Sequence, residues 1–200
     1  MGFLQQRSGA ANSLLVFSIF VGKKKNKQVD WSFMNERIIL SREDITKMPV
    51  DAIVNAANSK LAGGGGVDGA IHRAAGAELL EACNLLNGCQ TGSAKITKGF
   101  SLPAKFVIHA VGPVWRGGNN DEAELLASCY LTSLQLAKEK HCKTIAFSNI
   151  STGIYGFPKR EAAVIAIDTV RKFLKENTSP EQVCFVCFDE ENFLIYKELM

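Results

Sequence analysis

The sequence lacks the features that define membrane, disulfide-rich and repetitive proteins. The apolar run at residues 14–21 is much shorter than the roughly 20 residues that span a bilayer, so no membrane span is predicted. No internal repeat or low-complexity linker interrupts the 200 residues, and this length with 46% hydrophobic content suits one well-buried domain. The six cysteines lie mostly in apolar segments and form no dense disulfide framework, which predicts a reduced, cytoplasmic protein.

Two of these cysteines, Cys184 and Cys187, form a C-x-x-C pair. Residues 183–188 nevertheless read as one continuous strand, in which successive side chains point to opposite faces. The two thiols should therefore point apart, and a redox or zinc role is not favoured.

Basic charge is scarce outside the N-terminal segment. The formal net charge is +3, but the first 33 residues hold five basic residues against one acid, which leaves the remainder near −1. Nucleic-acid backbones are normally gripped by patches of Lys and Arg. A nearly neutral domain therefore favours a small anionic ligand, and no nucleic-acid partner is expected.

Residues 1–33 are predicted to be an extension outside the fold, with the domain at 34–200, because the first strand with a core-like pattern follows Met34. The apolar run at 14–21 resembles the centre of a secretory signal, but the basic stretch at 22–27 stands where a small-residue cleavage site would be. The alternative is a targeting or anchoring segment, which would place the protein in an organelle or at a membrane.

Strands and helices alternate from Met34 onward. Strands are expected near 36–40, 51–56, 94–99, 106–111, 144–148 and 182–188, and helices near 67–75, 77–87, 122–140, 158–175 and 191–199. The strand at 106–111 is apolar on both faces, as expected of a sheet that is covered on both sides. The pattern predicts an α/β fold, a three-layer α/β/α sandwich with a mixed central sheet.

Two strand–turn–helix units carry glycine-rich turns. Four consecutive glycines at 63–66 follow the strand at 51–56, and the turn at 151–156 follows the strand at 144–148. Glycine runs persist mainly where backbone approaches a ligand closely or takes positive φ. Each turn leads into a helix N-terminus, whose unpaired N–H groups attract anions, at the carboxyl end of a strand. Two such cradles in one sheet predict a diphosphate ligand.

Other phosphate motifs fit less well. Neither turn supplies the lysine that follows the last glycine of a P-loop. Residues 64–69 match the dinucleotide pattern G-x-G-x-x-G, but residues 58–62 separate them from the strand, and the acids about 20 residues later lie on a helix. Neither triphosphate hydrolysis nor hydride transfer is therefore favoured, and no cofactor is predicted.

Four ordered motifs lie along the chain. They are D-A-I-V-N-A-A-N at 51–58, G-G-G-G-V-D-G-A-I-H at 63–72, I-H-A-V-G-P at 108–113 and I-S-T-G-I-Y-G-F-P at 150–158. Together they resemble the motifs of a macrodomain of the MacroD type. The resemblance extends from about residue 36 to residue 200. It implies an ADP-ribose pocket and hydrolysis of ADP-ribose from acidic side chains and of O-acetyl-ADP-ribose. The implied partners are ADP-ribose, its esters and mono-ADP-ribosylated proteins, and a monomer is expected.

The resemblance also implies how ADP-ribose is held. Asp44 would accept the adenine amino group beside the backbone of Ile45, although Glu43 stands where the family usually has glycine. Phe188 would stack on the adenine and Tyr155 would lie against the distal ribose, unless either is a plain core aromatic. The diphosphate would be bound by the two glycine turns, through Gly65, Gly66, Val67, Ser151, Thr152, Gly153 and Ile154.

Asn58, Asp68 and His72 are the candidate catalytic residues. By resemblance, Asn58 would hydrogen-bond the distal ribose, and Asp68 would orient or deprotonate the attacking water. Apart from the resemblance, Asp68 could simply interact favourably with the dipole of its helix. His72 lies one turn later, where it either influences the Asp68 carboxyl group or only contributes to packing. Asn55 is expected to satisfy neighbouring loop backbone, and His109, inside an apolar strand, to be structural.

Neither covalent nor metal catalysis is indicated. No serine or cysteine stands beside a histidine and an acid in the loops, and no ligands have metal spacing, so no metal is predicted. Water is then the expected nucleophile, positioned by the diphosphate and Asp68. A hydrolase and a non-catalytic reader of ADP-ribose both remain open. Asp68 favours the hydrolase, because a reader gains little from an acid beside an anionic ligand.

Overall fold

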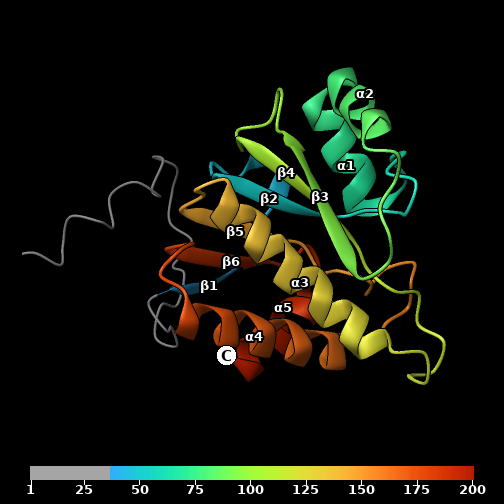
Figure 1. The fold of residues 1–200 in the computed structure, drawn as a ribbon. Coiled ribbons are helices and arrows are strands. Elements are labelled where there is room, and N and C mark those ends of the chain that lie inside the picture. The colour runs from blue at the N-terminus through green and yellow to red at the C-terminus, as the bar shows by residue number, and fades with distance from the viewer. Residues whose placement is uncertain (1–36) are drawn as a thin grey trace, which may run out of the picture. The chain divides into compact units, whose positions relative to one another are not determined.

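A six-stranded sheet runs through the part of the chain that the computed structural model describes, residues 37–200 (Figure 1). The predicted extension at 1–33 lies outside the described residues. The strands are β1 (Ile38–Ser41), β2 (Ala52–Ala56), β3 (Ser93–Lys98), β4 (Phe106–Val111), β5 (Thr144–Phe147) and β6 (Gln182–Val186). Their order is β1-β6-β5-β2-β4-β3, and every pair is parallel except β3 with β4. The predicted mixed sheet is confirmed.

The five predicted helices are also present. They are α1 (Gly66–Ala75), α2 (Ala77–Leu85), α3 (Glu122–Glu139), α4 (Lys159–Glu176) and α5 (Glu190–Leu199), and their ends differ from the predicted ones by two residues at most. A short 3-10 helix, η1 (Ile45–Lys47), was not predicted. A single turn of helix has no apolar periodicity that a sequence pattern could show.

The helices form a layer on each face of the sheet. Core residues of α3, α4 and α5 pack on one face, and those of η1, α1 and α2 pack on the other (Figure 1). Neighbouring residues of β2 illustrate the alternation, since Val54 belongs to the first core and Ile53 to the second. The two thiols of the C-x-x-C pair point apart as predicted, because Cys187 lies in the first core and Cys184 in the second. The continuous strand predicted at 183–188 is shorter, however, since β6 ends at Val186. The three-layer sandwich is therefore the observed architecture.

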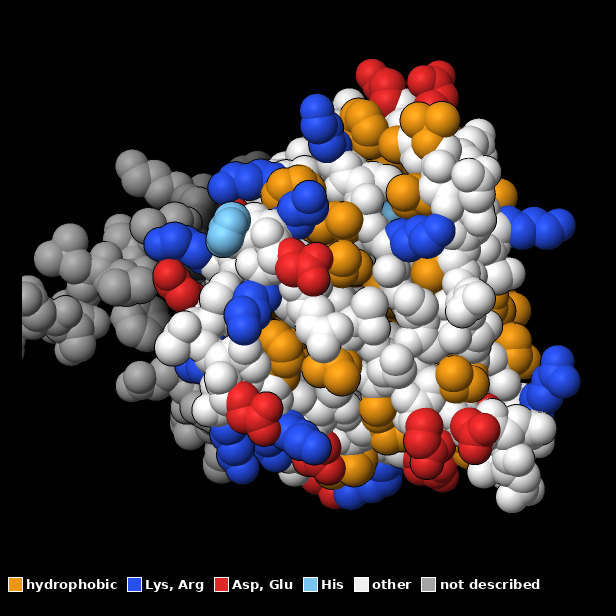
Figure 2. All heavy atoms as spheres, in the orientation of Figure 1, with side chains coloured by type: hydrophobic (Ala, Val, Ile, Leu, Met, Phe, Trp, Pro, Cys, Tyr) orange, Lys and Arg blue, Asp and Glu red, His pale blue; other side chains and the backbone are white. Residues whose placement is uncertain are grey.

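The residues that the structure describes include no membrane-spanning helix, and they form no basic stripe on the face that Figure 2 draws. Between residues 37 and 200 no helix has the length and apolarity to cross a bilayer. All six cysteines are buried and free. On the face that carries α3 and α4, basic and acidic side chains are interspersed (Figure 2). This distribution gives no support to a nucleic-acid-binding role for that face.

Four loops meet at one edge of the sheet because β1, β2, β5 and β6 are parallel and adjacent in the order given above. The loop after β2 is the four-glycine run, and the loop after β5 is the turn at 151–156. Asp44 and Ile45 follow β1, and Phe188 follows β6. All predicted ligand-binding residues therefore lie at the carboxyl ends of parallel strands, where open α/β sheets hold ligands.

Candidate active site

Asn58 shapes the loop between β2 and α1. Its Nδ2 donates to the carbonyl of Gly63 at 2.7 Å, and its Oδ1 accepts from the amides of Lys60 at 3.1 Å and Ala62 at 3.4 Å. Gly63 and Gly66 have φ values of +73° and +57°, which L side chains rarely adopt. The glycine run is thus a folded loop held by one amide, and Asn58 has a structural role besides its predicted contact with ribose.

The N-terminus of α1 is free of side-chain capping. Its N-cap residue is Gly65, which offers no side-chain acceptor to the first amides of the helix. The loop folds back so closely that a Cβ on Gly69 would overlap the carbonyl oxygen of Gly64. Glycine is therefore required at position 69 for packing, inside a helix where alanine would otherwise be preferred. The uncapped amides of the first turn remain as donors for an anion.

The turn after β5 is fixed by backbone hydrogen bonds. The amide of Phe157 donates to Ser151 at 3.0 Å, and the amide of Gly156 donates to Gly153 at 3.0 Å. A Cβ on Gly112, just after β4, would overlap Ser151 Oγ, so the glycine in the I-H-A-V-G-P motif admits this turn. A Cβ on Gly153, in contrast, would meet no atom within 4 Å. Gly153 therefore borders open space, as a diphosphate-binding residue should.

The other predicted residues of this turn contribute in different ways. Ser151 Oγ is buried and has no hydrogen-bond partner among the described residues, so its side chain is not open to a ligand. Tyr155 is half-buried and its carbonyl accepts from the amide of Trp115 at 2.9 Å. Thr152 is half-buried, and Ile154 is 90% exposed. The exposed part of this turn therefore consists of glycine backbone and of the apolar side chain of Ile154.

Asp68 is the buried acid of the site, with only 6% of its surface exposed. Asn55 Nδ2 donates to its Oδ1 at 2.7 Å, and Asn58 Nδ2 donates to its Oδ2 at 3.4 Å. His72 Nε2 lies 3.5 Å from Oδ1, too far for a strong hydrogen bond. A Cβ on Gly64 would lie 3.3 Å from Oδ2, so the absence of a side chain there leaves room beside this oxygen. The three candidate catalytic residues therefore lie together.

The expectation for Asn55 was wrong. Asn55 belongs to strand β2 rather than to the loop, it is fully buried, and its amide donates to the Asp68 carboxylate instead of to backbone. The strand places every second side chain on the α1 face, so Asn55 points at the helix that carries Asp68. The expectation for His109 is borne out in part, because His109 is fully buried, but it belongs to the same polar group.

The residues predicted to hold adenine lie at the ends of β1 and β6. Asp44 caps η1, since its Oδ1 accepts from the amide and the hydroxyl of Thr46 at 3.0 and 2.6 Å. The Thr46 hydroxyl is the main cause of a lowered pKa of Asp44, which keeps the carboxylate ionised. Ile45 is buried, whereas Phe188 is 84% exposed. Phe188 is therefore an open aromatic platform and not a core residue.

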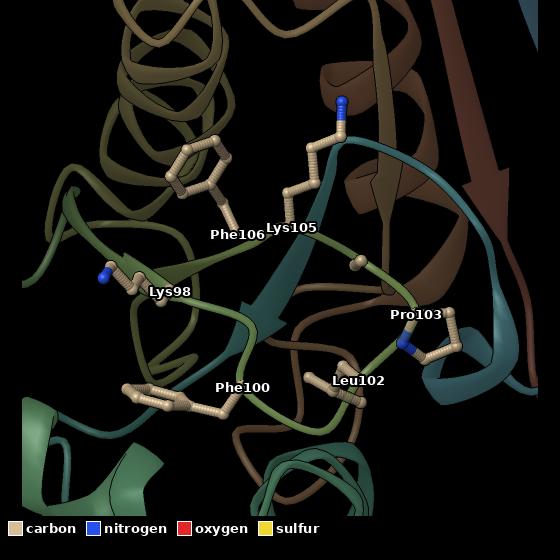
Figure 3. Close-up of a pocket in the computed structure, with 7 residues that line it drawn as sticks. Lys98, Phe100, Leu102, Pro103, Lys105 and Phe106 are labelled. Carbon is tan, nitrogen blue, oxygen red and sulfur yellow. The ribbon is translucent and has the colours of Figure 1, made fainter.

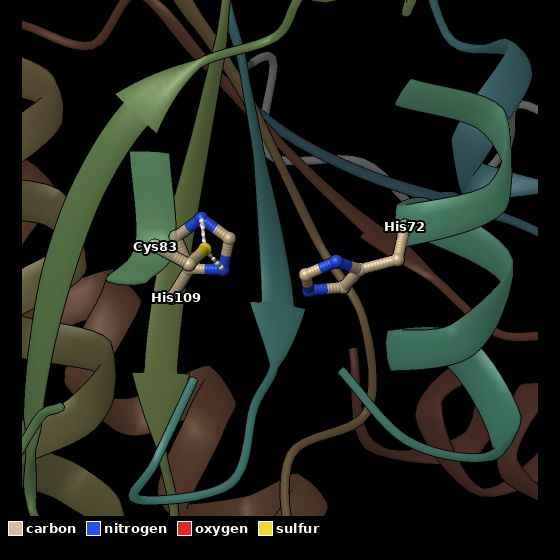
Figure 4. Close-up of side chains that lie close together, drawn as sticks. All are labelled: His72, Cys83 and His109. Carbon is tan, nitrogen blue, oxygen red and sulfur yellow. Dashed lines mark hydrogen bonds between the residues drawn. The ribbon is translucent and has the colours of Figure 1, made fainter. Parts of the chain in front are cut away.

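The fold also brings together His72, Cys83 and His109, which sequence spacing did not reveal (Figure 4). One ligand atom from each lies within 4.8 Å of the others. Cys83 Sγ, however, is 3.6 Å from Nε2 and 4.0 Å from Nδ1 of His109, and Figure 4 shows it in front of the ring. A metal binds imidazole along a nitrogen lone pair, in the ring plane. The sulfur position is therefore explained by packing over the ring.

A shallow hollow of about 460 Å³ lies away from these loops (Figure 3). Its lining comes from the β3–β4 connection, between Lys98 and Phe106, at the amino end of β4. It contains no acid or histidine, and Lys105 is paired with Asp51 at 2.7 Å. The hollow therefore lacks both the buried acid and the glycine loops, and the candidate site is the edge of the sheet that carries them.

The class of protein follows from the fold and the site. Two glycine loops and an uncapped helix N-terminus at one edge of an α/β/α sandwich are typical of an anion-binding protein. Residues 54–166 match the family model described as Macro domain. The chain belongs to the macro domain family, which confirms the resemblance drawn from the motifs.

Relatives and solved structures agree with this assignment. A macro domain-containing protein of Chlorobaculum tepidum is 64% identical over 80% of this chain and 92% of its own length. A protein of Citrobacter rodentium named O-acetyl-ADP-ribose deacetylase is 55% identical over 84% of this chain and 97% of its own. The Trypanosoma brucei macrodomain in complex with ADP-ribose shares 45% identity with a TM-score of 0.77, over 82% of this chain and 68% of that one. The Oceanobacillus iheyensis macrodomain with ADP shares 47% identity with a TM-score of 0.78, over 82% and 90%.

Proposed function

We propose that this protein is a hydrolase that binds ADP-ribose, deacetylates O-acetyl-ADP-ribose and removes ADP-ribose from mono-ADP-ribosylated acidic side chains. The relative named O-acetyl-ADP-ribose deacetylase and the ADP-ribose complex of a similar macrodomain support the proposal. The observation that carries it is the placement of Asp68, a buried acid in the first turn of α1 beside the four-glycine loop. The partners in this proposal are ADP-ribose, its esters and ADP-ribosylated proteins.

In the proposed complex the diphosphate lies between the two glycine loops. The amides of residues 65–67 and 151–154 donate to its oxygens, and the dipole of α1 adds to the attraction. The adenine lies toward the ends of β1 and β6, where Asp44 accepts its amino group, Ile45 lies beside it and Phe188 stacks on it. The distal ribose lies near Asn58 and Tyr155. This orientation brings the ester bond to the edge where Asp68 lies.

Water is the nucleophile in the proposed reaction. It is held between the diphosphate and Asp68 Oδ2, on the side that Gly64 leaves open. In O-acetyl-ADP-ribose the water oxygen bonds to the acetyl carbonyl carbon and the ester C–O bond breaks, which releases acetate and ADP-ribose. In an ADP-ribosylated carboxylate the water attacks the anomeric carbon and the side-chain carboxylate leaves. Asp68 accepts a hydrogen bond from this water, and positioning supplies much of the rate.

The experiment that tests the proposal measures binding and turnover together. The protein is incubated with O-acetyl-ADP-ribose and with a mono-ADP-ribosylated protein, free ADP-ribose is assayed, and ADP-ribose affinity is measured by calorimetry. Asp68→Ala is expected to keep ADP-ribose binding and to lose hydrolysis by about 10²–10⁴-fold, the usual contribution of a general base.

A matched control tests whether Asp68 acts only on the helix dipole. Glu78 is the acid in the first turn of α2, as Asp68 is in the first turn of α1, but Glu78 is exposed. Glu78→Ala should leave turnover unchanged. Wild-type turnover in Asp68→Ala would remove Asp68 from the mechanism. Binding without turnover in the wild-type protein would identify a reader module instead.

A further inference from the structure

A buried chain of hydrogen bonds lies behind Asp68. Asn55 and His109 are register partners on β2 and β4, and both are fully buried on the face covered by α1 and α2. Asn55 Nδ2 lies 2.7 Å from Asp68 Oδ1 and 3.3 Å from His109 Nδ1. His109 Nε2 lies 3.0 Å from Thr97 Oγ1 on β3. The chain therefore links three strands of the sheet to the acid of the proposed site.

The proton on His109 follows from its neighbours. An amide nitrogen only donates and a carboxylate only accepts, so Asn55 must turn its Nδ2 toward Asp68. The same nitrogen faces His109 Nδ1, which must then be the unprotonated nitrogen and accept. The remaining proton is on Nε2, where it can be donated to Thr97. Burial, with a contribution from the charge of His72, lowers the pKa of His109 to about 3, so the ring is neutral at working pH.

Within residues 37–200, the oxygen of the Asn55 amide accepts no hydrogen bond that would fix its orientation. Oδ1 is buried and has no hydrogen-bond partner among the described residues. The orientation of the amide is therefore set at its nitrogen alone, by Asp68 and His109. A half-turn of the amide would place its oxygen against the Asp68 carboxylate, and a proton on His109 Nδ1 would favour that half-turn because it would then need an acceptor.

We infer that His109 is a positioning residue, which as a neutral imidazole protonated on Nε2 holds the Asn55 amide toward Asp68 and so keeps the carboxylate in its reactive orientation. This inference rests on the proposed hydrolysis by Asp68. His109 itself touches neither the ligand loops nor the reacting atoms. Its influence on the reaction passes through Asn55.

The protonation state of His109 is tested directly in the wild-type protein. Long-range proton–nitrogen correlation spectra of the nitrogen-15-labelled protein distinguish the two tautomers of each of the three histidines. His109 is assigned from its loss in a His109→Asn sample. The expected result is a neutral ring with the proton on Nε2. A proton on Nδ1 at neutral pH would overturn the inference, whether or not the protein hydrolyses ADP-ribose esters.

A matched pair of variants tests the effect on the reaction. His109→Leu removes the acceptor, whereas His109→Asn places Oδ1 where Nδ1 stood, and both remove the group that faces Thr97. His109→Leu is expected to lower kcat by about 10- to 100-fold, the cost of a misplaced catalytic group, with the ADP-ribose dissociation constant unchanged. His109→Asn is expected to restore most of kcat.

The outcomes separate this inference from the proposed function. Equal losses of kcat in the two variants would assign His109 a packing role only and overturn the inference, and so would a loss confined to ADP-ribose affinity. Lack of turnover in the wild-type protein would instead overturn the proposed function, while the tautomer of His109 would still be measured. If His109→Leu does not fold, two measurements still test the inference: the tautomer of His109 in the wild-type protein and the kcat of His109→Asn relative to the wild-type protein. A large loss of kcat in His109→Asn would contradict the inference, because this variant keeps a hydrogen-bond acceptor at the position of Nδ1.

Discussion

Gly65 and Ile154 face each other across the two glycine loops, since a Cβ on Gly65 would lie 3.9 Å from Ile154 Cδ1. The loops are far apart in sequence and meet because β2 and β5 are parallel neighbours in the sheet. Each loop is ordered by its own hydrogen bonds, and Gly153 borders open space. A ligand between the loops can therefore be contacted by backbone from both sides.

Gly153→Glu is expected to abolish ADP-ribose binding while the protein stays folded. The added carboxylate would enter the space beside the loop and repel the diphosphate. Because a Cβ at this position meets no atom within 4 Å, Gly153→Ala is the matched control and should bind normally. Calorimetry with ADP-ribose and thermal unfolding measure both properties. Normal affinity in Gly153→Glu would place the ligand elsewhere on the protein.

Phe188→Ala is expected to weaken ADP-ribose binding without affecting stability. Stacking of a base on an aromatic side chain contributes about 1–3 kcal/mol, which corresponds to about 5- to 150-fold in the dissociation constant. Leu85 is 82% exposed and Phe188 is 84% exposed, so Leu85→Ala is a control for loss of an exposed apolar side chain. Calorimetry should show weaker binding for Phe188→Ala alone. Equal affinities in the two variants would show that adenine does not stack on Phe188.

Glu122 should make stability depend on acid pH. Burial opposes ionisation of this carboxylate, but the amides of Asn120 at 2.6 Å and Arg116 at 2.9 Å outweigh burial and lower its pKa to about 2. Because the folded-state pKa is depressed from its ordinary value of 4.5, the stabilisation is present above pH 4.5 and is lost as the pH falls toward 2.

Urea unfolding of Glu122→Gln between pH 2 and pH 7 measures this effect. The variant is expected to be less stable than the wild-type protein at pH 7, with the difference shrinking below pH 4.5. Glu139→Gln, at the exposed end of α3, is the control and should follow the wild-type curve. If the difference in free energy of unfolding between the variant and the wild-type protein were constant from pH 2 to pH 7, Glu122 would stabilise the fold by packing and not by its charge.

Deletion of residues 1–33 is expected to leave the melting temperature and ADP-ribose ester hydrolysis unchanged. The four family motifs and every described strand and helix begin after this segment. Both quantities are compared in the full and truncated chains. A large fall in either would mean that the apolar run at 14–21 contributes to the domain, and would contradict a domain boundary at residue 34.

The elements of the fold were predictable because their signals are local. A strand such as 106–111 is recognised by its apolar residues alone, and the helices by apolar spacing over several turns. The single-turn helix η1 escaped prediction because it depends on one carboxylate, that of Asp44, which accepts from Thr46. The two glycine turns were identified for a similar local reason, since backbone without side chains has few uses other than close approach or positive φ.

The alternation of strands and helices, the two glycine loops and the macro domain family could be identified without a structure, because each depends on contiguous residues. The contacts of Asn55 with Asp68 and with His109 could not, because they join residues from three different elements. These contacts depend on the register of β2 against β4 and on the packing of α1 over them. Register and packing are set by the whole core, so no local pattern along the chain encodes them.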